Sequence, residues 1–167
     1  MTATIAEFLT AAKVDAGAVD PAAVGAPKIT VGVPEGWQQV PAGTFPGTYA
    51  VWTQAPVNGW ADNAVVVVVQ LAQRVDAGEL LAHAYGDARL LPQWTDAETD
   101  TSSVDGFPSA AITGTYLVDK LTLWAYNRYI VLESEAGQFL AQLTITTRNE
   151  SDGSDAATIL EGLSVSV

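Results

Sequence analysis

The stretch that decides the fold is NAVVVVVQLA, residues 63–72. Its five consecutive valines are β-branched, and β-branched residues are enriched in strands. A strand with one wet face alternates apolar and polar residues, whereas this run is continuously apolar, as in strands buried on both faces. The run is about half the length needed to span a bilayer, so we expect a central strand and no membrane anchor. Helices must therefore cover the sheet.

Three helices are predicted around this strand. Thr4 and Glu7 have the spacing of a capping box before a short amphipathic helix with an apolar face at Ile5, Phe8, Leu9 and Ala12. A longer helix is expected over residues 76–91, where Asp76 can cap its start and Pro92 ends it. A third is expected over residues 154–161. The helix at 76–91 is the best candidate to cover the sheet, since Leu80, Ala84, Ala88 and Leu91 form an apolar stripe.

Further strands are predicted on both sides of the central run. They cover residues 28–33, 48–54, 109–117, 120–132, 139–147 and 163–167. The segments 120–132 and 139–147 are separated by a loop that contains a glycine, which predicts an antiparallel hairpin. We therefore expect an α+β fold with a mainly antiparallel sheet.

Composition limits the partners of the chain. A length of 167 residues is typical of one domain, and 49% apolar residues with 16% charged residues indicate a globular protein. The formal net charge is -12, from 19 acidic and seven scattered basic residues, so nucleic acid and anionic membranes are repelled. Basic partners or neutral ligands are favoured instead.

The chain contains no cysteine, which excludes disulfides, thiolate metal sites, a cysteine nucleophile and a lipid-acceptor thiol within it. The residues after Met1 also lack the basic segment, apolar stretch and cleavage site of a secretory signal. If the chain is full length, we expect it in the cytoplasm. If a leader was removed, we expect it in the cell envelope or outside the cell.

Catalytic chemistry has few candidates here. His83 is the only histidine, and helical spacing would place it beside Glu79 and Asp87, as in a weak metal site, a proton shuttle or an ordinary solvated helix face. The solvated face is the simplest interpretation. The nucleophile motif Gly-x-Ser-x-Gly is absent, and residues 152–155 are better explained as a turn and a helix cap. We predict that the protein is not an enzyme and uses no cofactor or metal; a hydrolase would need carboxylates or a metal.

The acidic string in residues 96–105 resembles a calcium loop only superficially, since the central glycine and the terminal bidentate acid of that motif are missing. An ordinary solvated edge explains this composition better.

Aromatic residues are the feature that points most to a ligand. Five tryptophans and five tyrosines are many for this length, and an indole can line an apolar cleft while its N–H binds a sugar or headgroup. The alternative is that most of them fill the core. Alternation in the strand 120–132 places Trp124 and Tyr126 on the face that carries polar neighbours. The candidate ligand-binding residues are Trp124, Tyr126, Trp94, Tyr116 and Trp52.

Four stretches carry a resemblance to a known family. They are GAPKI (25–29) leading to PEGW (34–37); VD (75–76) leading to LLPQW (90–94); GF (106–107) with GTY (114–116); and FLAQL (139–143). In this order they resemble the LpqN/LpqT lipoproteins and secreted antigens of mycobacteria. The resemblance implies a PsbP-like α/β sandwich and a place at the cell envelope, where such proteins are mostly exported and often lipid-anchored. The missing signal and cysteine depart from that pattern.

Two functional hypotheses follow. The first is a non-catalytic binding or accessory domain that supports envelope biogenesis and holds an envelope lipid or glycolipid in a cleft between the sheet and the helix at 76–91. The ligand class comes mainly from the family resemblance. The second is a protein-interaction module without a small ligand, whose acidic surface recruits a basic protein partner.

Overall fold

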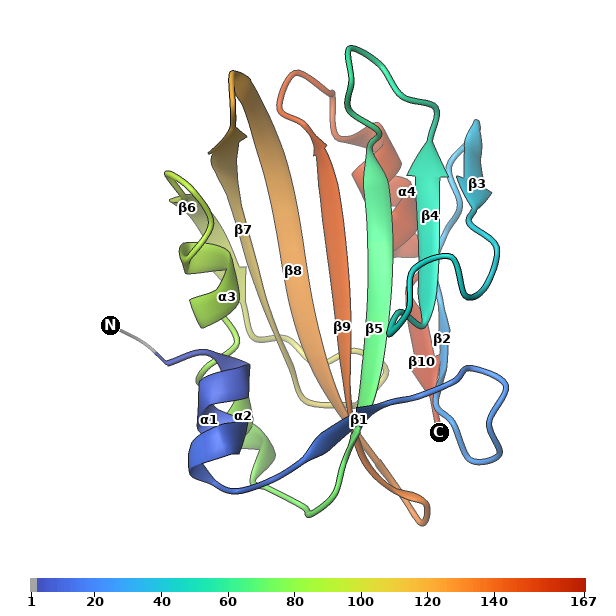
Figure 1. The fold of residues 1–167 in the computed structure, drawn as a ribbon, viewed down its shortest axis with the longest axis vertical. Helices are drawn as coiled ribbons and strands as arrows, with labels where there is room; N and C mark the ends of the chain where they lie inside the picture. Colours follow the sequence, from blue (N-terminus) through green and yellow to red (C-terminus); the bar gives the residue numbers. More distant parts are fainter. Residues whose placement is uncertain (1–2) are drawn as a thin grey trace.

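Residues 3–167 are described by a computed structural model of the chain. They form a large antiparallel sheet, a two-stranded sheet and four helices (Figure 1). The helices are α1 (Ile5–Ala11), α2 (Ala77–Leu81), α3 (Gly86–Arg89) and α4 (Ser154–Glu161). The strands are β1 (Ala16–Ala18), β2 (Lys28–Thr30), β3 (Trp37–Gln39), β4 (Ala50–Gln54), β5 (Asn63–Leu71), β6 (Thr95–Asp100), β7 (Ser109–Val118), β8 (Leu121–Ser134), β9 (Gly137–Arg148) and β10 (Ser164–Ser166).

The large sheet has the order β3-β4-β5-β9-β8-β7-β6, with β1 paired to the end of β5 and every pair antiparallel. The valine strand β5 is central, as predicted. Its burial alternates, however: Val66 and Val68 are wholly buried on one side, whereas Val65 and Val67 are half-buried on the other. The expected cover on both faces is therefore complete on one face and partial on the other.

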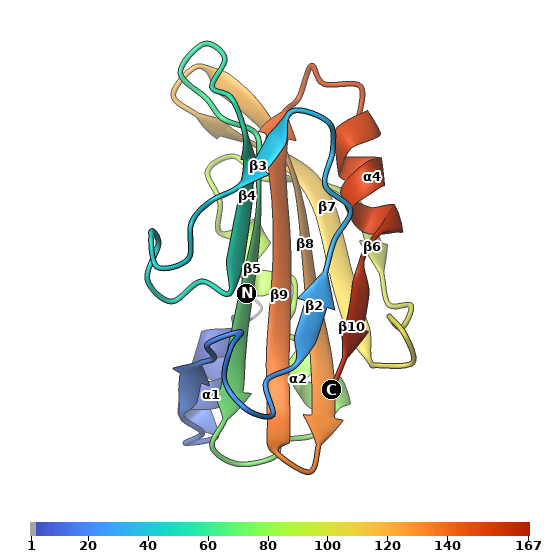
Figure 2. The same ribbon diagram turned by 90° about the vertical axis from the view of Figure 1, so that its right-hand side faces the viewer.

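The α4 face is the completely covered side of the sheet. Figure 2 shows α4 and the β2–β10 ribbon together on this side, with α1 on the opposite side. Ala156 and Ile159 of α4 and Ile29 and Val165 of the ribbon join one apolar core with the inward residues of the sheet. Trp37 belongs to the same core, and its Nε1 donates to Asp155 of α4 over 3.1 Å.

The α1 face is the partly covered side. Ile5 and Leu9 of α1 and Leu80 of α2 pack with Tyr129 and Leu140 of the sheet in a second, smaller core. Among residues 3–167, no helix lies over the upper halves of β5, β8 and β9 on this side (Figure 1). This part of the face has no helical cover, yet Leu123, Ala125, Asn127 and Thr146 on it are buried by other side chains and loops.

The predicted helix over residues 76–91 is wrong in its continuity. Asp76 does cap α2, accepting a hydrogen bond from the N–H of Glu79 at 2.9 Å, but α2 ends at Leu81 and the short helix α3 follows after a turn. The turn covers residues 82–85, and Gly86, the first residue of α3, lies so close to the α1 segment that a β-carbon there would be 2.9 Å from the carbonyl oxygen of Ala3. Tertiary packing against the α1 segment thus overrides the local helical pattern.

Other predictions hold to within a few residues. The Thr4–Glu7 capping box and the helix at residues 154–161 are present as expected. The loop in the β8–β9 hairpin is shorter than predicted, because the strands stay paired as far as Ser134 and Gly137. Strands β1, β3 and β6 were not predicted. The mainly antiparallel α+β sandwich with helices on its faces is confirmed.

Candidate functional site

The five aromatic candidates do not converge on one site. Trp124, Tyr126 and Trp52 project to the α4 face, whereas Trp94 and Tyr116 lie on the α1 face. Trp52 is only 8% exposed within the α4-face core, so its role there is packing. The helical segment at residues 76–91 packs on the α1 face, so the expected cleft between it and the sheet would lie on that face.

An apolar cavity of about 200 Å³ lies on the α1 face between α1, α3 and the sheet. We call it the α1 cavity. Aliphatic side chains from α1, β5 and β9 form most of its wall, and polar atoms come from Asp87, Tyr129 and Gln142. Its volume is below the range of about 300–1,000 Å³ typical of small-molecule sites, so it has room for only part of a ligand.

The hydroxyl of Tyr129 donates a hydrogen bond to Asp87 Oδ2 at the edge of the α1 cavity. Tyr129 is 4% exposed, and its burial, together with the neighbouring carboxylate, raises the pKa of the phenol strongly. This bond holds α3 against β8. It also satisfies the polar atom that the sheet would otherwise bury.

A strip of uncharged polar side chains continues from the α1 cavity along the sheet; Gln142 and Thr144 are partly exposed, whereas Asn127 and Thr146 are buried behind them. The Oδ1 atom of Asn127 accepts hydrogen bonds from Gln142 Nε2 at 2.8 Å and Thr144 Oγ1 at 2.9 Å. Gln142 lines the α1 cavity as well, so the cavity and the strip meet at this side chain. We call the set Asn127, Gln142, Thr144 and Thr146 the polar strip.

Trp94 lies beside the polar strip and packs over Gly114. A β-carbon at Gly114 would lie 2.4 Å from Cζ2 of Trp94, so the indole occupies the space above this glycine. Gly114 pairs with Ala125 of β8, which pairs with Thr146 of the strip. A glycine inside a strand is typical of such close approaches.

The indole is also fixed from its other end. Its Nε1 donates to Asp96 Oδ1, and Asp96 is held in turn by Arg89 of α3, with Nη2 2.7 Å from Oδ2. The hydrogen bonds from Arg89 and then from Trp94 lower the pKa of the Asp96 carboxyl. Trp94 is therefore a half-exposed aromatic surface in a defined position.

Tyr116 lies two residues beyond Gly114 on the same face of β7. Burial raises the pKa of its phenol, and a hydrogen bond with Thr146 opposes this shift. Through Thr146, Tyr116 reaches the polar strip. The structure thus brings two of the five candidates, Trp94 and Tyr116, to one uncharged surface next to an apolar cavity.

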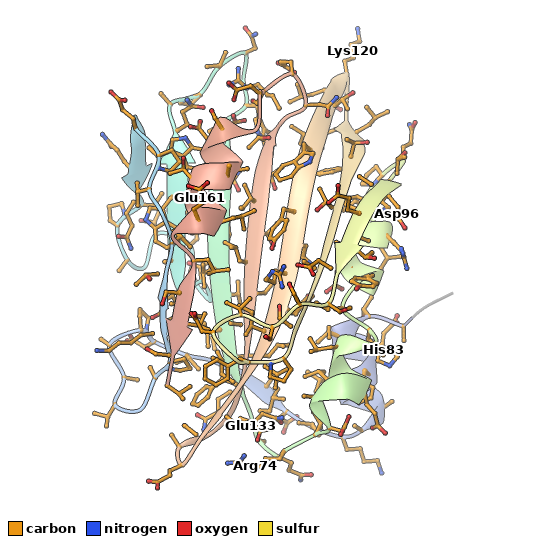
Figure 3. All side chains as sticks on the ribbon, turned by 180° about the vertical axis from the view of Figure 1, so that it is seen from behind. Arg74, His83, Asp96, Lys120, Glu133 and Glu161 are labelled. Atoms are coloured by element: carbon orange, nitrogen blue, oxygen red, sulfur yellow. The ribbon has the colours of Figure 1, made fainter. Side chains whose placement is uncertain are left out.

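The remaining pair, Trp124 and Tyr126, stacks with ring centroids 6.4 Å apart beside α4. Trp124 is half-buried, whereas Tyr126 is only 8% exposed and belongs to the α4-face core, as Trp52 does. Figure 3 views the protein from this side, with Glu161 marking α4 and Asp96 marking the edge strand β6. Trp124 lines a cavity of about 420 Å³, and Tyr126 lines one of about 380 Å³. Leu160 of α4 borders both cavities, which we call together the α4 groove.

A buried guanidinium supports Tyr126. Arg128 is 6% exposed and donates to Tyr126 Oη at 2.5 Å, to Ser109 Oγ at 2.6 Å and to Asp100 Oδ2 at 2.5 Å. The backbone N–H of Ser102, then its hydroxyl, then Arg128 lower the pKa of Asp100 to about 2. Most of the acidic stretch forms β6, which is an exposed edge strand as predicted; in addition, Asp96 and Asp100 form ion pairs with Arg89 and Arg128.

The residues considered for metal or proton chemistry lie apart. His83 stacks on Phe8 with ring centroids 4.9 Å apart and places Nδ1 3.1 Å from the carbonyl oxygen of Ala3, while Asp87 binds Tyr129. The break between α2 and α3 separates them. Within residues 3–167, no group of three or more His, Asp or Glu side chains is arranged to hold a metal ion. No helix in that range is long and apolar enough to cross a membrane.

Comparison with protein families identifies relatives. The family described as "Probable lipoprotein LpqN" matches residues 1–166. The chain belongs to the LpqN lipoprotein family. This family match confirms the predicted resemblance. Two of the motifs that carried it also contact each other in the structure, since Trp94 of LLPQW packs over Gly114 of GTY.

Individual relatives of this LpqN-family chain are mycobacterial. The chain is 32% identical over 141 residues to the proline-rich 28 kDa antigen of Mycobacterium tuberculosis, covering 82% of this chain and 46% of the relative. It is 36% identical over 109 residues to the LpqT lipoprotein of the same species, covering 61% of this chain and 48% of the relative. The chain thus spans about half the length of these curated relatives.

A solved structure shares the whole fold. The crystal structure of LpqN of Mycobacterium tuberculosis, described as involved in cell envelope biogenesis, superposes with a TM-score of 0.88 at 19% identity and covers 99% of both chains. At this identity the likeness establishes the fold of the LpqN-family protein and not its ligand.

Several site residues escaped sequence reasoning. Asn127, Gln142 and Thr144 come from strands β8 and β9, and only the register brings their side chains together. Arg128 was not singled out because an isolated arginine in a strand carries no signal of burial. Gly114 did carry one, since a glycine within an apolar strand indicates a close neighbour.

Proposed function

We propose that this LpqN-family protein is a non-catalytic binding domain that holds an uncharged amphiphile of the cell envelope, such as a neutral lipid or glycolipid. The ligand's apolar chain would enter the α1 cavity and its head would lie on the polar strip. The observation that carries the proposal is the junction at Gln142, where an apolar cavity meets an uncharged polar surface.

The polar strip fits a hydrogen-bonding head. Its partly exposed members, the amide of Gln142 and the hydroxyl of Thr144, can both donate and accept, which a sugar or glycerol head requires. Trp94 and Tyr116 add aromatic surface with a polar edge beside the strip, in the arrangement common to ligand sites. Because Trp94 is held by Gly114 and Asp96, little conformational freedom is lost when a ligand covers it.

The negative charge of the protein favours a ligand with an uncharged head group over one with an anionic head group. The net charge of the chain is -12, which repels phosphate-bearing heads. The neighbouring charged groups are already engaged: Asp96 with Arg89, Asp87 with Tyr129, and Arg148 with the buried Asp62. A neutral head would meet hydrogen-bonding groups without displacing any of these pairs.

Two further observations support the setting. His83 and Asp87 serve in packing contacts on the same face, which favours binding over catalysis. Membership of a lipoprotein family, and a structural relative described as involved in cell envelope biogenesis, favour an envelope location and a role in envelope biogenesis.

A pair of detergents with the same dodecyl chain tests the proposal. We expect dodecyl maltoside, added below its micellar concentration, to bind at least about tenfold more tightly than dodecyl phosphate, because the anion meets an acidic protein. Isothermal titration calorimetry gives both affinities. Equal affinities, or tighter binding of dodecyl phosphate, would refute the uncharged-head proposal.

Two variants locate the site. Val67→Phe fills the α1 cavity from a half-buried position, and Trp94→Ala removes the aromatic surface, so each should weaken dodecyl maltoside binding by about tenfold. Trp124→Ala on the opposite face is the control and should leave the affinity unchanged. If Trp124→Ala alone weakened binding, the ligand would occupy the α4 groove instead.

A second candidate function is the interaction module with a basic partner. The acids that line the α4 groove favour it as an additional activity on the other face.

A further inference from the structure

The α4 groove is chemically unlike the α1-face site. Its two cavities are neighbours, since the stacked rings of Trp124 and Tyr126 form part of their separate walls and Leu160 borders both. Trp124 is half-buried and so presents part of its indole to the groove. The groove thus offers two neighbouring aromatic pockets instead of one continuous apolar tunnel.

Charge in the groove is negative. Glu98 and Asp100 line the Tyr126 cavity and Asp152 lines the Trp124 cavity, against the guanidinium of Arg128. Arg128 is committed to Asp100, whereas Glu98 takes part in none of the ion pairs formed by residues 3–167. An incoming cation would therefore meet unneutralised carboxylates next to aromatic rings.

Arg128 itself shows that this environment accepts a guanidinium. Its Cζ lies 5.7 Å from the centre of the Tyr126 ring, within the range of a cation–π contact, and its Nη2 binds Asp100. An aromatic ring and a carboxylate also line the Trp124 cavity together, where the half-buried Trp124 and the exposed Asp152 are both part of the wall. In the neighbouring cavity the exposed Glu98 lies in the wall with the buried Tyr126.

The spacing of the two residues that line the pockets, Trp124 and Tyr126 at alternate positions of β8, matches that of an extended peptide. Alternate side chains of an extended chain point the same way at intervals of about 6.6 Å, given a rise of about 3.3 Å per residue. The ring centroids of Trp124 and Tyr126 are 6.4 Å apart. Two basic side chains separated by one residue would therefore reach the two pockets together.

We propose that the α4 groove binds an extended basic segment of a partner protein, with arginine or lysine at alternate positions, one over the half-buried Trp124 and the next against the carboxylate of Glu98 in the neighbouring cavity. This site is separate from the amphiphile site and lies on the opposite face of the sheet. Binding would rest on charge and cation–π contacts, so it is expected to be salt-sensitive and weak for a short peptide.

The test uses the full chain and a fluorescein-labelled peptide, Thr-Arg-Val-Arg-Val-Thr, whose binding is followed by fluorescence anisotropy. We expect the affinity to fall by about fivefold or more when salt rises from about 50 to about 300 mM, since exposed charges are then screened. The peptide Thr-Arg-Arg-Val-Val-Thr has the same charge in the wrong spacing, and we expect it to bind about threefold more weakly, because one contact is lost.

Pairs of matched variants test whether the peptide binds in the α4 groove. Ala157 is exposed on α4 and lines the Trp124 cavity, so Ala157→Arg introduces a competing guanidinium without disturbing the core and should weaken binding by about tenfold. Ala11→Arg, at an exposed position on α1, gives the same net charge and should bind within about twofold of wild type. Glu98→Gln should weaken binding about two- to fivefold, and Glu135→Gln at the distant hairpin should not.

Three results would overturn the proposal. The first is wild-type affinity in Ala157→Arg, and the second is equal binding of the two peptide spacings. The third is displacement of the peptide by dodecyl maltoside with loss of both ligands in Ala157→Arg, which would make the groove an amphiphile site. Because Val67→Phe and Trp94→Ala should leave peptide binding unchanged, failure here is distinguishable from failure of the amphiphile proposal.

Discussion

The indole of Trp94 fills the space in which a side chain at position 114 would have to lie. These two residues are twenty positions apart, on the loop before β6 and within β7, and the sheet brings them together because β6 and β7 pair antiparallel. A glycine in a strand interior weakens the strand locally. Here the absence of a side chain leaves space for the indole of Trp94 on the α1 face of the sheet. The pairing of β6 with β7 therefore fixes the position of Trp94 in the proposed amphiphile site.

Gly114→Ala tests the packing of Trp94 over position 114. The new β-carbon would lie 2.4 Å from both Trp94 Cζ2 and the carbonyl oxygen of Thr95, so we expect the free energy of unfolding to fall by about 1–3 kcal/mol through overpacking. Dodecyl maltoside binding should fall as well, since the indole is displaced. Urea denaturation and calorimetry measure the two effects. Gly17→Ala, on β1 with open space around it, should change stability by less than about 0.5 kcal/mol; an equal loss there would contradict the reason given.

Gly162→Ala tests the close approach of α4 to the segment after β2. A β-carbon at Gly162 would lie 2.3 Å from the backbone nitrogen and 2.5 Å from the Cα of Gly32, and backbone atoms cannot move aside as a side chain can. We expect a loss of about 2–3 kcal/mol in the free energy of unfolding, measured by urea denaturation. A stability within about 0.5 kcal/mol of wild type would show that α4 shifts freely on the sheet.

Low pH should weaken the ion pair between Asp100 of β6 and Arg128 of β8. The pKa of Asp100 is lowered to about 2 in the folded chain, against about 3.9 when unfolded, so its contribution is present above about pH 4 and is lost as the pH falls toward 2. The stability difference between wild type and Asp100→Asn should therefore shrink over this range. Urea midpoints at several pH values measure it. Glu135→Gln at the exposed hairpin is the control, and a difference that stays constant for Asp100→Asn would contradict the assignment.

Alkali should act on the Tyr129–Asp87 contact. Because burial and the Asp87 carboxylate raise the pKa of Tyr129 in the folded state, its stabilising effect is present below about pH 10 and is lost as the pH rises above that value. Tyr129→Phe removes the hydroxyl and should cost about 1–3 kcal/mol at neutral pH, as for hydrogen bonds to charged groups. Denaturation curves between neutral pH and pH about 10.5 should show a flatter pH dependence in the variant. An unchanged slope would mean that another group controls alkaline stability.

Local signals in the sequence were sufficient for much of the fold. The capping box at Thr4, the turn before α4 and the valine run of β5 depend on neighbours within a few residues, and the structure contains each of them. The prediction was wrong where distant contacts matter: the helix expected over residues 76–91 is interrupted at residues 82–85, and the following helix packs at Gly86 against the backbone of Ala3. Strand β6 was not predicted because its polar residues carry no apolar periodicity and are held by pairing with β7.

The candidate site was predicted less well, for a similar reason. Alternation correctly placed Trp124 and Tyr126 on one face, but it could not tell which face, or that Trp94 and Tyr116 would lie on the other. The order of β8 and β9 in the sheet, and the pairing of Asn127 with Thr144, decide where the polar strip forms.

By itself, the sequence determined the class of fold, the acidic character, the family and the identity of the aromatic residues, because composition, capping and periodicity act through near neighbours in the chain. Only the tertiary structure decided that the aromatic residues serve two faces, that a cavity borders the polar strip at Gln142, and that Arg128 is buried beside Asp100. These are properties of strand register and layer packing, which join residues that are distant along the chain and leave no local pattern.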